Sequence, residues 1–246
     1  MEFLIFILIL TVSFIFAMLG LGGGMVYVPL LHWMGFDFKQ IALPLGLLLN
    51  GLNTMLALIP YSRKKLVDWK GGSFMAVSAM IGSPLGAYTS QFVNTHILKL
   101  IFAFVVVFAA IRMLFIAGKE AEKMASLRKK FIGIIVGLSV GFLGGMLGIG
   151  GGFIFAPVLM WLGYKTKNAA ATTAYVVTFS SFTGFLGHVS EGHFNPWLTA
   201  VVIIAVIIGS QLGANFMTSK AKPKTVKQIY ALVLFGIGLK FILEIL

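Results

Sequence analysis

The sequence predicts an all-α integral membrane protein with about eight transmembrane segments, arranged as two inverted repeats of four elements each. Three observations predict this fold class. Hydrophobic residues make up 59% and charged residues 11% of the 246 residues, and the mean hydropathy is +1.00, whereas soluble domains carry about 25% charged residues. Apolar runs of about 20 residues, the length that crosses a bilayer, recur along the chain. One glycine-rich motif occurs twice.

The apolar runs follow one another with only short polar loops between them. They cover residues 3–34, 41–61, 71–92, 97–117, 131–162, 169–187, 196–217 and 226–246. The first and the fifth run are longer than one upright span needs, and these two contain the glycine-rich motif. We therefore expect the first and fifth elements to be broken or re-entrant at the motif, and the other six to be single helices.

The duplication of the motif extends to the whole chain. The motif occupies residues 20–29 and 148–157, an offset of 128, and the same offset relates Trp69 to Trp197. Such self-similarity indicates two homologous halves. The predicted divisions are a first membrane repeat at 1–118, a cytoplasmic linker loop at 119–130 and a second membrane repeat at 131–246.

The lysine and arginine residues of the loops distinguish two topologies. If every run crosses once, the two sides of the membrane carry nine and seven of these residues. If the first and fifth elements enter and leave on the same side, the loops at 62–70, 118–130, 163–168 and 218–227 fall together with fifteen, and the remaining loops carry one. The positive-inside rule favours the second arrangement, in which each half crosses an odd number of times and the halves are inverted. A tilted, broken span stays open as the alternative, because the return arm after each motif is short.

Charge and cysteine content exclude several classes of function. The net charge is +12, but the basic residues lie in short loops between spans, which is typical of topogenic charge and not of a nucleic-acid surface. The chain has no cysteine, so disulfide, zinc–thiolate and thiol chemistry are excluded. All seven acidic residues fall in expected loops or at span ends, so we expect no intramembrane carboxylate. The start of the chain lacks a basic region, so no cleaved signal peptide is expected. We expect no cofactor and no metal site.

The two glycine motifs predict an anion site. A glycine cluster interrupts the helix inside an apolar run, and a new helix begins after it. The unpaired N–H groups and the positive dipole end of that new helix favour an anion, and two such ends in inverted repeats would converge near the middle of the membrane. The predicted substrate contacts are Gly22, Gly23, Gly24 and Met25 in the first motif and Gly150, Gly151, Gly152 and Phe153 in the second. The alternative is that the glycines only permit a tight turn or close packing.

Polar residues in the second and sixth runs add candidate ligands. At the offset of 128, Asn50 matches Thr178 and Asn53 matches Ser181, and residues three apart share a helix face. These side chains would complete the coordination of an oxyanion, or they would form hydrogen bonds between helices. The predicted polar contacts are Asn50, Asn53, Thr172, Thr173, Thr178, Ser181 and, in the seventh run, Gln211.

Two other patterns carry less weight. His188 and His193 flank Glu191 and would suit a metal pair, but their position predicts a loop surface. Ser139 lies in a Gly-x-Ser-x-Gly pattern typical of a nucleophile elbow, but this elbow requires a preceding strand and the surrounding run predicts a helix.

The sequence resembles the TauE/SafE family, also called the toluene sulfonate uptake permease family. The resemblance rests on the paired motifs at 20–29 and 148–157, the Ala-Thr-Thr segment at 171–173 and the duplicated layout, and it covers essentially the whole chain. It implies bacterial inner-membrane transport of sulfur-containing anions such as sulfite and sulfoacetate. In the first half residues 42–45 read Ala-Leu-Pro-Leu, so the two halves need not contribute equally to a site.

From the residues and the resemblance together we expect a secondary transporter for a sulfur-containing anion, sulfite or an organosulfonate. Substrate would be held at the glycine-rich helix breaks and carried by alternating access, in a multi-pass protein of the bacterial cytoplasmic (inner) membrane. The alternatives are an anion channel and, less favoured, an intramembrane enzyme that uses Ser139 and His188. The expected partners are the small anion and the lipid bilayer, with no nucleic acid. A homodimer and coupling to a proton or Na⁺ stay open.

Overall fold

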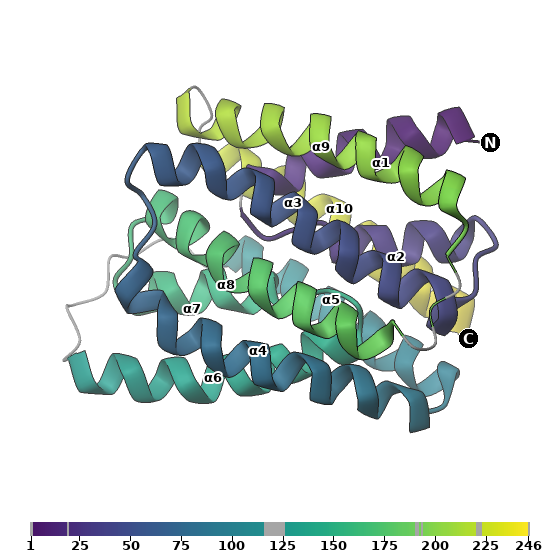
Figure 1. Ribbon diagram of the computed structural model, residues 1–246, viewed down its shortest axis with the longest axis horizontal. Helices are drawn as coiled ribbons and strands as arrows, with labels where there is room; N and C mark the ends of the chain where they lie inside the picture. Colours follow the sequence, from purple (N-terminus) through teal and green to yellow (C-terminus); the bar gives the residue numbers. More distant parts are fainter. Residues whose placement is uncertain are drawn as a thin grey trace.

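The computed structural model describes residues 2–18, 20–115, 126–189, 192, 194–219 and 223–245, and this part of the chain is a bundle of helices (Figure 1). The first half contains α1 (Glu2–Ala17), α2 (Gly24–Trp33), the short π-helical segment η1 (Phe38–Ala42), α3 (Leu43–Arg63), α4 (Trp69–Phe92) and α5 (Thr95–Phe115). The second half contains α6 (Ser126–Met146), α7 (Gly152–Trp161), α8 (Thr166–His188), α9 (Pro196–Ser219) and α10 (Pro223–Ile245). The predicted linker loop lies outside the described residues up to position 125, and positions 126–130 belong to α6.

The first and fifth apolar runs are each divided into two helices at the glycine motif. The backbone between α1 and α2, and between α6 and α7, contains several glycines with positive φ angles. These are Gly20, Gly22, Gly148, Gly150 and Gly151. Left-handed backbone is costly for any residue with a Cβ, so the glycines allow both helices to stop and the chain to turn inside an apolar run.

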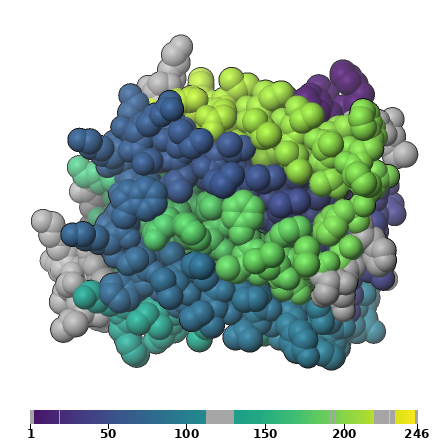
Figure 2. All heavy atoms as spheres, viewed as in Figure 1, coloured from purple at the N-terminus to yellow at the C-terminus, as the bar shows by residue number. Residues whose placement is uncertain are grey.

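Helices α3 and α8 cross the centre of the bundle in opposite directions. Asn50 of α3 bonds to Ser181 of α8, and Thr54 of α3 bonds to Thr178 of α8. Residue numbers therefore rise along α3 as they fall along α8. Figure 2 shows both helices reaching the surface next to each other, between α9 and α4.

Helices α5 and α10 form a second antiparallel pair. Lys99, near the start of α5, donates a hydrogen bond to Glu244 at the end of α10, and further along the pair the rings of Phe102 and Phe241 lie 5.2 Å apart. Trp33, the last residue of α2, donates its Nε1–H to the same carboxylate at 2.8 Å. The end of α2, the start of α5 and the end of α10 therefore meet at one end of the bundle.

Two further helix pairs join the halves through glycine. A Cβ on Gly82 of α4 would clash with the carbonyl oxygen of Leu138 in α6, and a Cβ on Gly209 of α9 would clash with that of Leu10 in α1. The two leucines are 128 positions apart and the two glycines 127, so the contacts are equivalent. Small residues let membrane helices approach closely. Each half thus packs one helix tightly on a helix of the other half, and the halves interlock.

The outer surface of the bundle is apolar. On α4 the exposed side chains of Val77, Ile81, Leu85 and Tyr88 recur every three to four residues and form one stripe. Such a stripe is typical of a helix that faces lipid. Among the described residues, three helical segments are long and apolar enough to cross a membrane: Phe38–Arg63, Thr166–His188 and Pro196–Thr218. The eight segments expected from the sequence stay a prediction.

The connections between helices gather at two ends of the bundle. The chain termini and the loop between α2 and α3 lie at the right in Figure 1, and the loops from α3 to α4 and from α7 to α8 lie at the left. Helix α1 therefore begins and α2 ends at the right end of the bundle, whereas α6 begins and α7 ends at the left end. The glycine turns that connect these pairs are buried in the interior.

Candidate functional site

The two glycine turns touch each other inside the bundle. A Cβ on Gly24 would lie 2.6 Å from the Cα of Ile149, and a Cβ on Gly152 would clash with the carbonyl oxygen of Leu21. Gly24 and Gly152 are 128 positions apart, and so are Leu21 and Ile149. The contact is therefore reciprocal, as at an interface between two copies related by a two-fold axis. Only glycine fits at either position, because the backbone of the opposite turn occupies the side-chain space.

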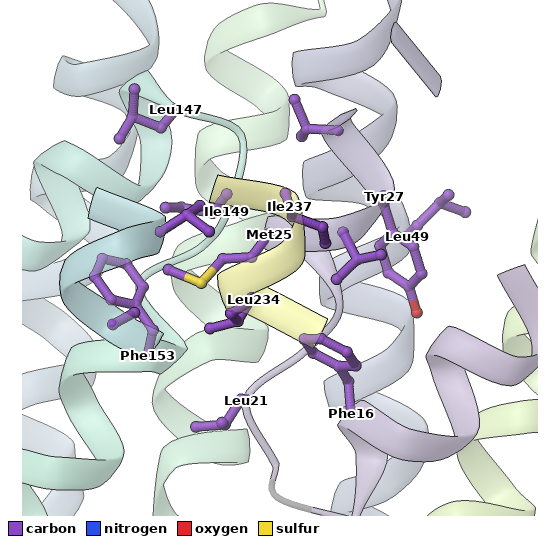
Figure 3. Close-up of a cluster of buried hydrophobic side chains, with 14 of the residues drawn as sticks. Phe16, Leu21, Met25, Tyr27, Leu49, Leu147, Ile149, Phe153, Leu234 and Ile237 are labelled. Carbon is purple, nitrogen blue, oxygen red and sulfur yellow. The ribbon is translucent and has the colours of Figure 1, made fainter. Parts of the chain in front are cut away.

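Apolar side chains from both turns surround this contact. Figure 3 shows Leu21 and Met25 of the first motif gathered with Ile149 and Phe153 of the second, next to Ile237 of α10, and all five belong to one buried cluster. Met25 and Phe153, which were predicted as substrate contacts, are 3% and 6% exposed. Phe153 also borders a small apolar cavity of about 130 Å³. Their side chains pack in the core, so an anion would meet their backbone N–H groups and not their side chains.

Asn50 of α3 connects both turns. Its Oδ1 accepts a hydrogen bond of 2.8 Å from the N–H of Gly24, and its Nδ2 donates one of 2.8 Å to Oγ of Ser181. The side chain is fully buried, and a Cβ on Gly22 or Gly150 would clash with its amide group. The structure therefore brings these five predicted residues together in one place.

The remaining two predicted glycines shape the turns. Gly23 and Gly151 are the N-cap residues of α2 and α7. A Cβ on Gly23 would clash with the ring of Tyr27, and Gly151 has a φ of 84°. Both positions have a conformational or packing reason for glycine, which is the alternative that the sequence left open, and their contact with substrate stays a prediction.

The first N–H groups of α2 and α7, the two helices that begin inside the bundle, differ in their hydrogen bonding. The first N–H of α2, that of Gly24, is bonded to Asn50. The residue equivalent to Asn50 in the second half is Thr178, whose shorter side chain bonds to Thr54 and to a carbonyl of its own helix. Among the described residues, no side chain accepts a hydrogen bond from Gly152, the first residue of α7. The N-terminus of α7 therefore keeps the N–H groups and the dipole end that favour an anion.

The hydroxyl of Ser181 has an unused hydrogen beside this N-terminus. Its Oγ accepts the bond from Asn50, and no described group accepts its own O–H. A Cβ on Gly150 would clash with this Oγ, so the hydroxyl lies directly against the turn before α7. The neighbouring Ser180, in contrast, donates to the carbonyl of Gly150 at 2.8 Å. Ser181 and the start of α7 are thus the donors available to an oxyanion.

A chain of hydrogen bonds runs from Asn53 to α1. Asn53 Nδ2 donates to the hydroxyl of Tyr27 at 2.9 Å, and that hydroxyl lies 2.7 Å from Oγ of Ser13. Because Ser13 gives its hydrogen to the carbonyl of Ile9, Tyr27 must donate to Ser13. Oδ1 of Asn53 is buried and has no partner in the described part of the chain. Sequence reasoning missed Tyr27 and Ser13, and the available signal was a polar side chain inside an apolar run.

Three other predicted residues do not join the turns. Thr172 accepts a hydrogen bond from the N–H of Asp68 at the start of α4, and Gln211 donates to the carbonyl of Leu56 in α3. Both side chains form hydrogen bonds between helices, which was the alternative given for the polar residues in the sequence analysis. Thr173 is fully buried, and its hydroxyl has no partner among the described residues.

His188 is buried, so the prediction of a loop surface was wrong. It is 2% exposed, and its Nε2 lies 3.0 Å from the carbonyl oxygen of Gly145. Its predicted neighbours Glu191 and His193 lie outside the described residues. Ser139 lies on the exposed face of α6 and forms no bond with His188, so this pair does not have the geometry of a nucleophile and its base. Within the described residues, no three histidine or acidic side chains gather as a metal site would require.

A cavity of about 620 Å³ lies away from the glycine turns, between the first turns of α4 and α6 and the end of α7. None of the predicted site residues lines it. The large cavity and the predicted substrate contacts therefore lie in different parts of the bundle. We place the candidate substrate site at the turns, because the buried hydroxyl of Ser181, whose hydrogen is unused, lies there next to a helix N-terminus.

The chain is similar to probable membrane transporter proteins over nearly its whole length. Residues 5–241 match the protein family described as sulfite exporter TauE/SafE. The chain is 30% identical to the probable membrane transporter protein YunE of Bacillus subtilis, with 99% of this chain and 98% of that protein covered. It is 25% identical to a probable membrane transporter protein of Methanocaldococcus jannaschii, with 98% and 97% covered. No solved structure matches the chain.

Proposed function

Because the chain belongs to the TauE/SafE sulfite exporter family, a family of integral membrane transporters, we propose that it is a carrier for a sulfur-containing anion in the bacterial cytoplasmic (inner) membrane. The substrate class is sulfite or an organosulfonate such as sulfoacetate. The relatives named as probable membrane transporters support a small-molecule substrate and a membrane location. Membership of a transporter family also argues against the intramembrane enzyme that would use Ser139 and His188.

The proposed topology has two inverted membrane repeats, at 1–118 and 131–246, each with one re-entrant hairpin. Three features support it. The equivalent helices α3 and α8 run antiparallel, as do α5 and α10. The glycine turns make a reciprocal contact. The loops from α3 to α4 and from α7 to α8, at the left end in Figure 1, carry six lysine and arginine residues, whereas the loop from α2 to α3 at the right carries one, so the left end is assigned to the cytoplasm.

The proposed substrate site is the N-terminus of α7 with the hydroxyl of Ser181. The observation that carries this proposal is the buried O–H of Ser181, which no described group accepts and which lies against the turn before α7. Hydrogen bonds to a charged partner in such a site contribute about 1.5–3 kcal/mol each. Donors of this kind hold an oxyanion without a buried cation, and a neutral site releases the anion more easily than a lysine or arginine would.

Alternating access would arise from movement between two packed groups of helices. Buried side chains from α4, α6, α7 and α8, among them Met75, Val140, Phe155 and Val176, form a hydrophobic cluster separate from the larger one. The glycine turns meet where these groups adjoin, and the close contact of Gly24 with Ile149 leaves no pore between them. This closure favours a carrier over an open anion channel.

The test is uptake of labelled sulfite into proteoliposomes, with sulfoacetate, taurine, thiosulfate and sulfate as competitors. Ser181→Ala should raise the KM on the order of tenfold, the effect of losing one charge-assisted hydrogen bond. Thr183→Ala is the matched control, because Thr183 lies on the same helix and bonds to its own backbone. A wild-type KM in Ser181→Ala, with unchanged thermal unfolding, would contradict the site. Uptake that does not saturate and shows no counterflow would favour a channel.

A further inference from the structure

The cavity of about 620 Å³ lies next to the loops from α3 to α4 and from α7 to α8, at the left end in Figure 1, which together carry six lysine and arginine residues. Its mouth and walls include Lys70, Phe74, Lys130, Gly133, Leu159 and Tyr164. The volume falls within the range of small-molecule sites, about 300–1,000 Å³. The cavity is separate from the glycine turns, so it needs an explanation of its own.

Two lysines make the mouth of the cavity positive. Lys70 and Lys130 are exposed, and among the described residues no carboxylate lies within ion-pair distance of either. Nζ of Lys130 lies 5.1 Å from the centre of the Phe74 ring, a cation–π contact that holds the ammonium group over the cavity. The mouth therefore favours an anionic group.

Among the described residues that line the cavity, the one carboxylate, that of Asp68, already accepts hydrogen bonds. Oδ1 of Asp68 accepts a hydrogen bond of 2.8 Å from the N–H of Gly71, and Oδ2 accepts one of 2.7 Å from the hydroxyl of Tyr164. Burial, together with the neighbouring Asp68, raises the pKa of Tyr164, so this hydroxyl stays a donor to the carboxylate at physiological pH. Asp68 thus caps α4 and leaves the two lysines without an internal partner.

The interior of the cavity is apolar, and one aromatic pair lies beside it. Met75 and Leu159, both buried, line its inner wall. Beside the cavity, the rings of Trp69 and Tyr175 lie 4.9 Å apart, and Trp69 is half exposed. Exposed tryptophan and tyrosine are typical of the membrane–water interface. The cavity therefore combines a charged mouth in the headgroup region with an apolar wall at greater depth.

The cavity is not a consequence of the internal duplication. At the offset of 128, Gly133 corresponds to Ile5 and Lys70 corresponds to Leu198, and both of these apolar side chains are buried. Lys130 corresponds to Glu2. The equivalent position in the other half is thus filled and lacks the positive pair, so the cavity is a feature of one half alone.

We propose that this cavity binds an anionic phospholipid of the cytoplasmic leaflet, with its phosphate between Lys70 and Lys130 and the start of an acyl chain along Phe74, Met75 and Leu159. Basic pockets between membrane helices on the cytoplasmic side suit lipid phosphates, and the apolar wall gives a reason to prefer a lipid over a free anion. The lipid would join α4, α6 and α7, which belong to one of the two helix groups described above.

Purified protein in nanodiscs tests the proposal, with retained phosphatidylglycerol measured by native mass spectrometry against a phosphatidylcholine background. The double variant Lys70→Gln/Lys130→Gln should bind phosphatidylglycerol on the order of 30-fold more weakly than the wild type. Lys64→Gln/Lys165→Gln is the matched control, because both of these lysines are exposed and neither lines the cavity. Equal losses in the two double variants would mean that only general surface charge attracts the lipid, and would overturn the proposal.

A second variant tests the cavity without changing charge. A Cβ on Gly133 would have its nearest neighbour, the nitrogen of Met75, at an ordinary 3.7 Å, so Gly133→Leu should fold and fill the cavity. It should lose phosphatidylglycerol, while Gly236→Leu, at a helical glycine with open space around it, should retain it. If glycerol 3-phosphate or inorganic phosphate displaces phosphatidylglycerol at low concentration, the site is for a soluble oxyanion and the lipid proposal fails. These outcomes are independent of sulfite uptake, which tests the proposed function.

Discussion

The hydroxyl of Tyr61 donates a hydrogen bond of 2.6 Å to the carbonyl oxygen of Met18, directly after the last residue of α1. The carbonyl oxygens at a helix end have no partner within the helix, and inside a membrane they have no water. In the second half, Nε2 of His188 lies 3.0 Å from the carbonyl oxygen of Gly145 near the end of α6, and the N–H groups of Ile149 and Gly150 both bond to the carbonyl of Gly144. Both glycine turns therefore have a side-chain contact from the long helix that follows, Tyr61 from α3 and His188 from α8, and the second turn also closes on its own backbone.

Tyr61→Phe should destabilise the protein by about 1–3 kcal/mol, because it leaves a buried carbonyl at the end of α1 without its donor. Thermal unfolding in detergent measures this loss. The matched control is Tyr88→Phe, since Tyr88 is 59% exposed on the outer face of α4 and its change should cost less than about 0.5 kcal/mol. Equal transitions for the two variants would show that the Tyr61 hydroxyl does not support the turn.

Asn50→Ala should destabilise the protein and impair transport. Removal of the amide leaves the N–H of Gly24 without its acceptor and Ser181 without its donor, both buried, at about 1–3 kcal/mol for each unsatisfied group. Asn215→Ala provides the control, because Asn215 is exposed on α9. Thermal unfolding and sulfite uptake are measured on the same preparation. If Asn50→Ala matched Asn215→Ala in both, Asn50 would not bridge the two turns.

Gly22→Ala and Gly35→Ala separate backbone strain from steric exclusion. Both glycines have positive φ angles, 69° and 92°, so either alanine should cost about 1–2 kcal/mol in backbone strain. A Cβ on Gly35 meets no atom within 4 Å, whereas one on Gly22 would clash with the Asn50 amide. Gly22→Ala should therefore cost about 3 kcal/mol or more in total and abolish uptake. Similar unfolding temperatures for the two variants would mean that Asn50 can move away from the turn.

Single cysteines test the inverted topology, and the natural chain has none that would interfere. Gln40 and Lys165 are exposed in equivalent regions of the two halves, after α2 and after α7. An impermeant maleimide added to intact cells should label Gln40→Cys, and should label Lys165→Cys only after the cytoplasmic membrane is permeabilised. Labelling of both variants from the same side would refute inverted repeats.

The sequence by itself determined the helical class, the duplication and the two helix breaks. These features depend on local properties: apolar length sets which segments form helices in a membrane, and clustered glycines set where a helix stops. The pattern also identified Asn50 and Ser181 as candidate ligands, because Asn50 and Asn53 match Thr178 and Ser181 at the 128 offset and residues three apart share a helix face.

The tertiary structure decided how these parts are used. Asn50 caps α2 while its counterpart Thr178 does not reach α7, a difference that depends on side-chain length at the crossing of α3 and α8. The burial of His188 and the cavity beside Gly133 likewise follow from which helices pack together across the two halves. Contacts between segments more than a hundred residues apart depend on the mutual fit of both partners, and neither segment carries that information alone.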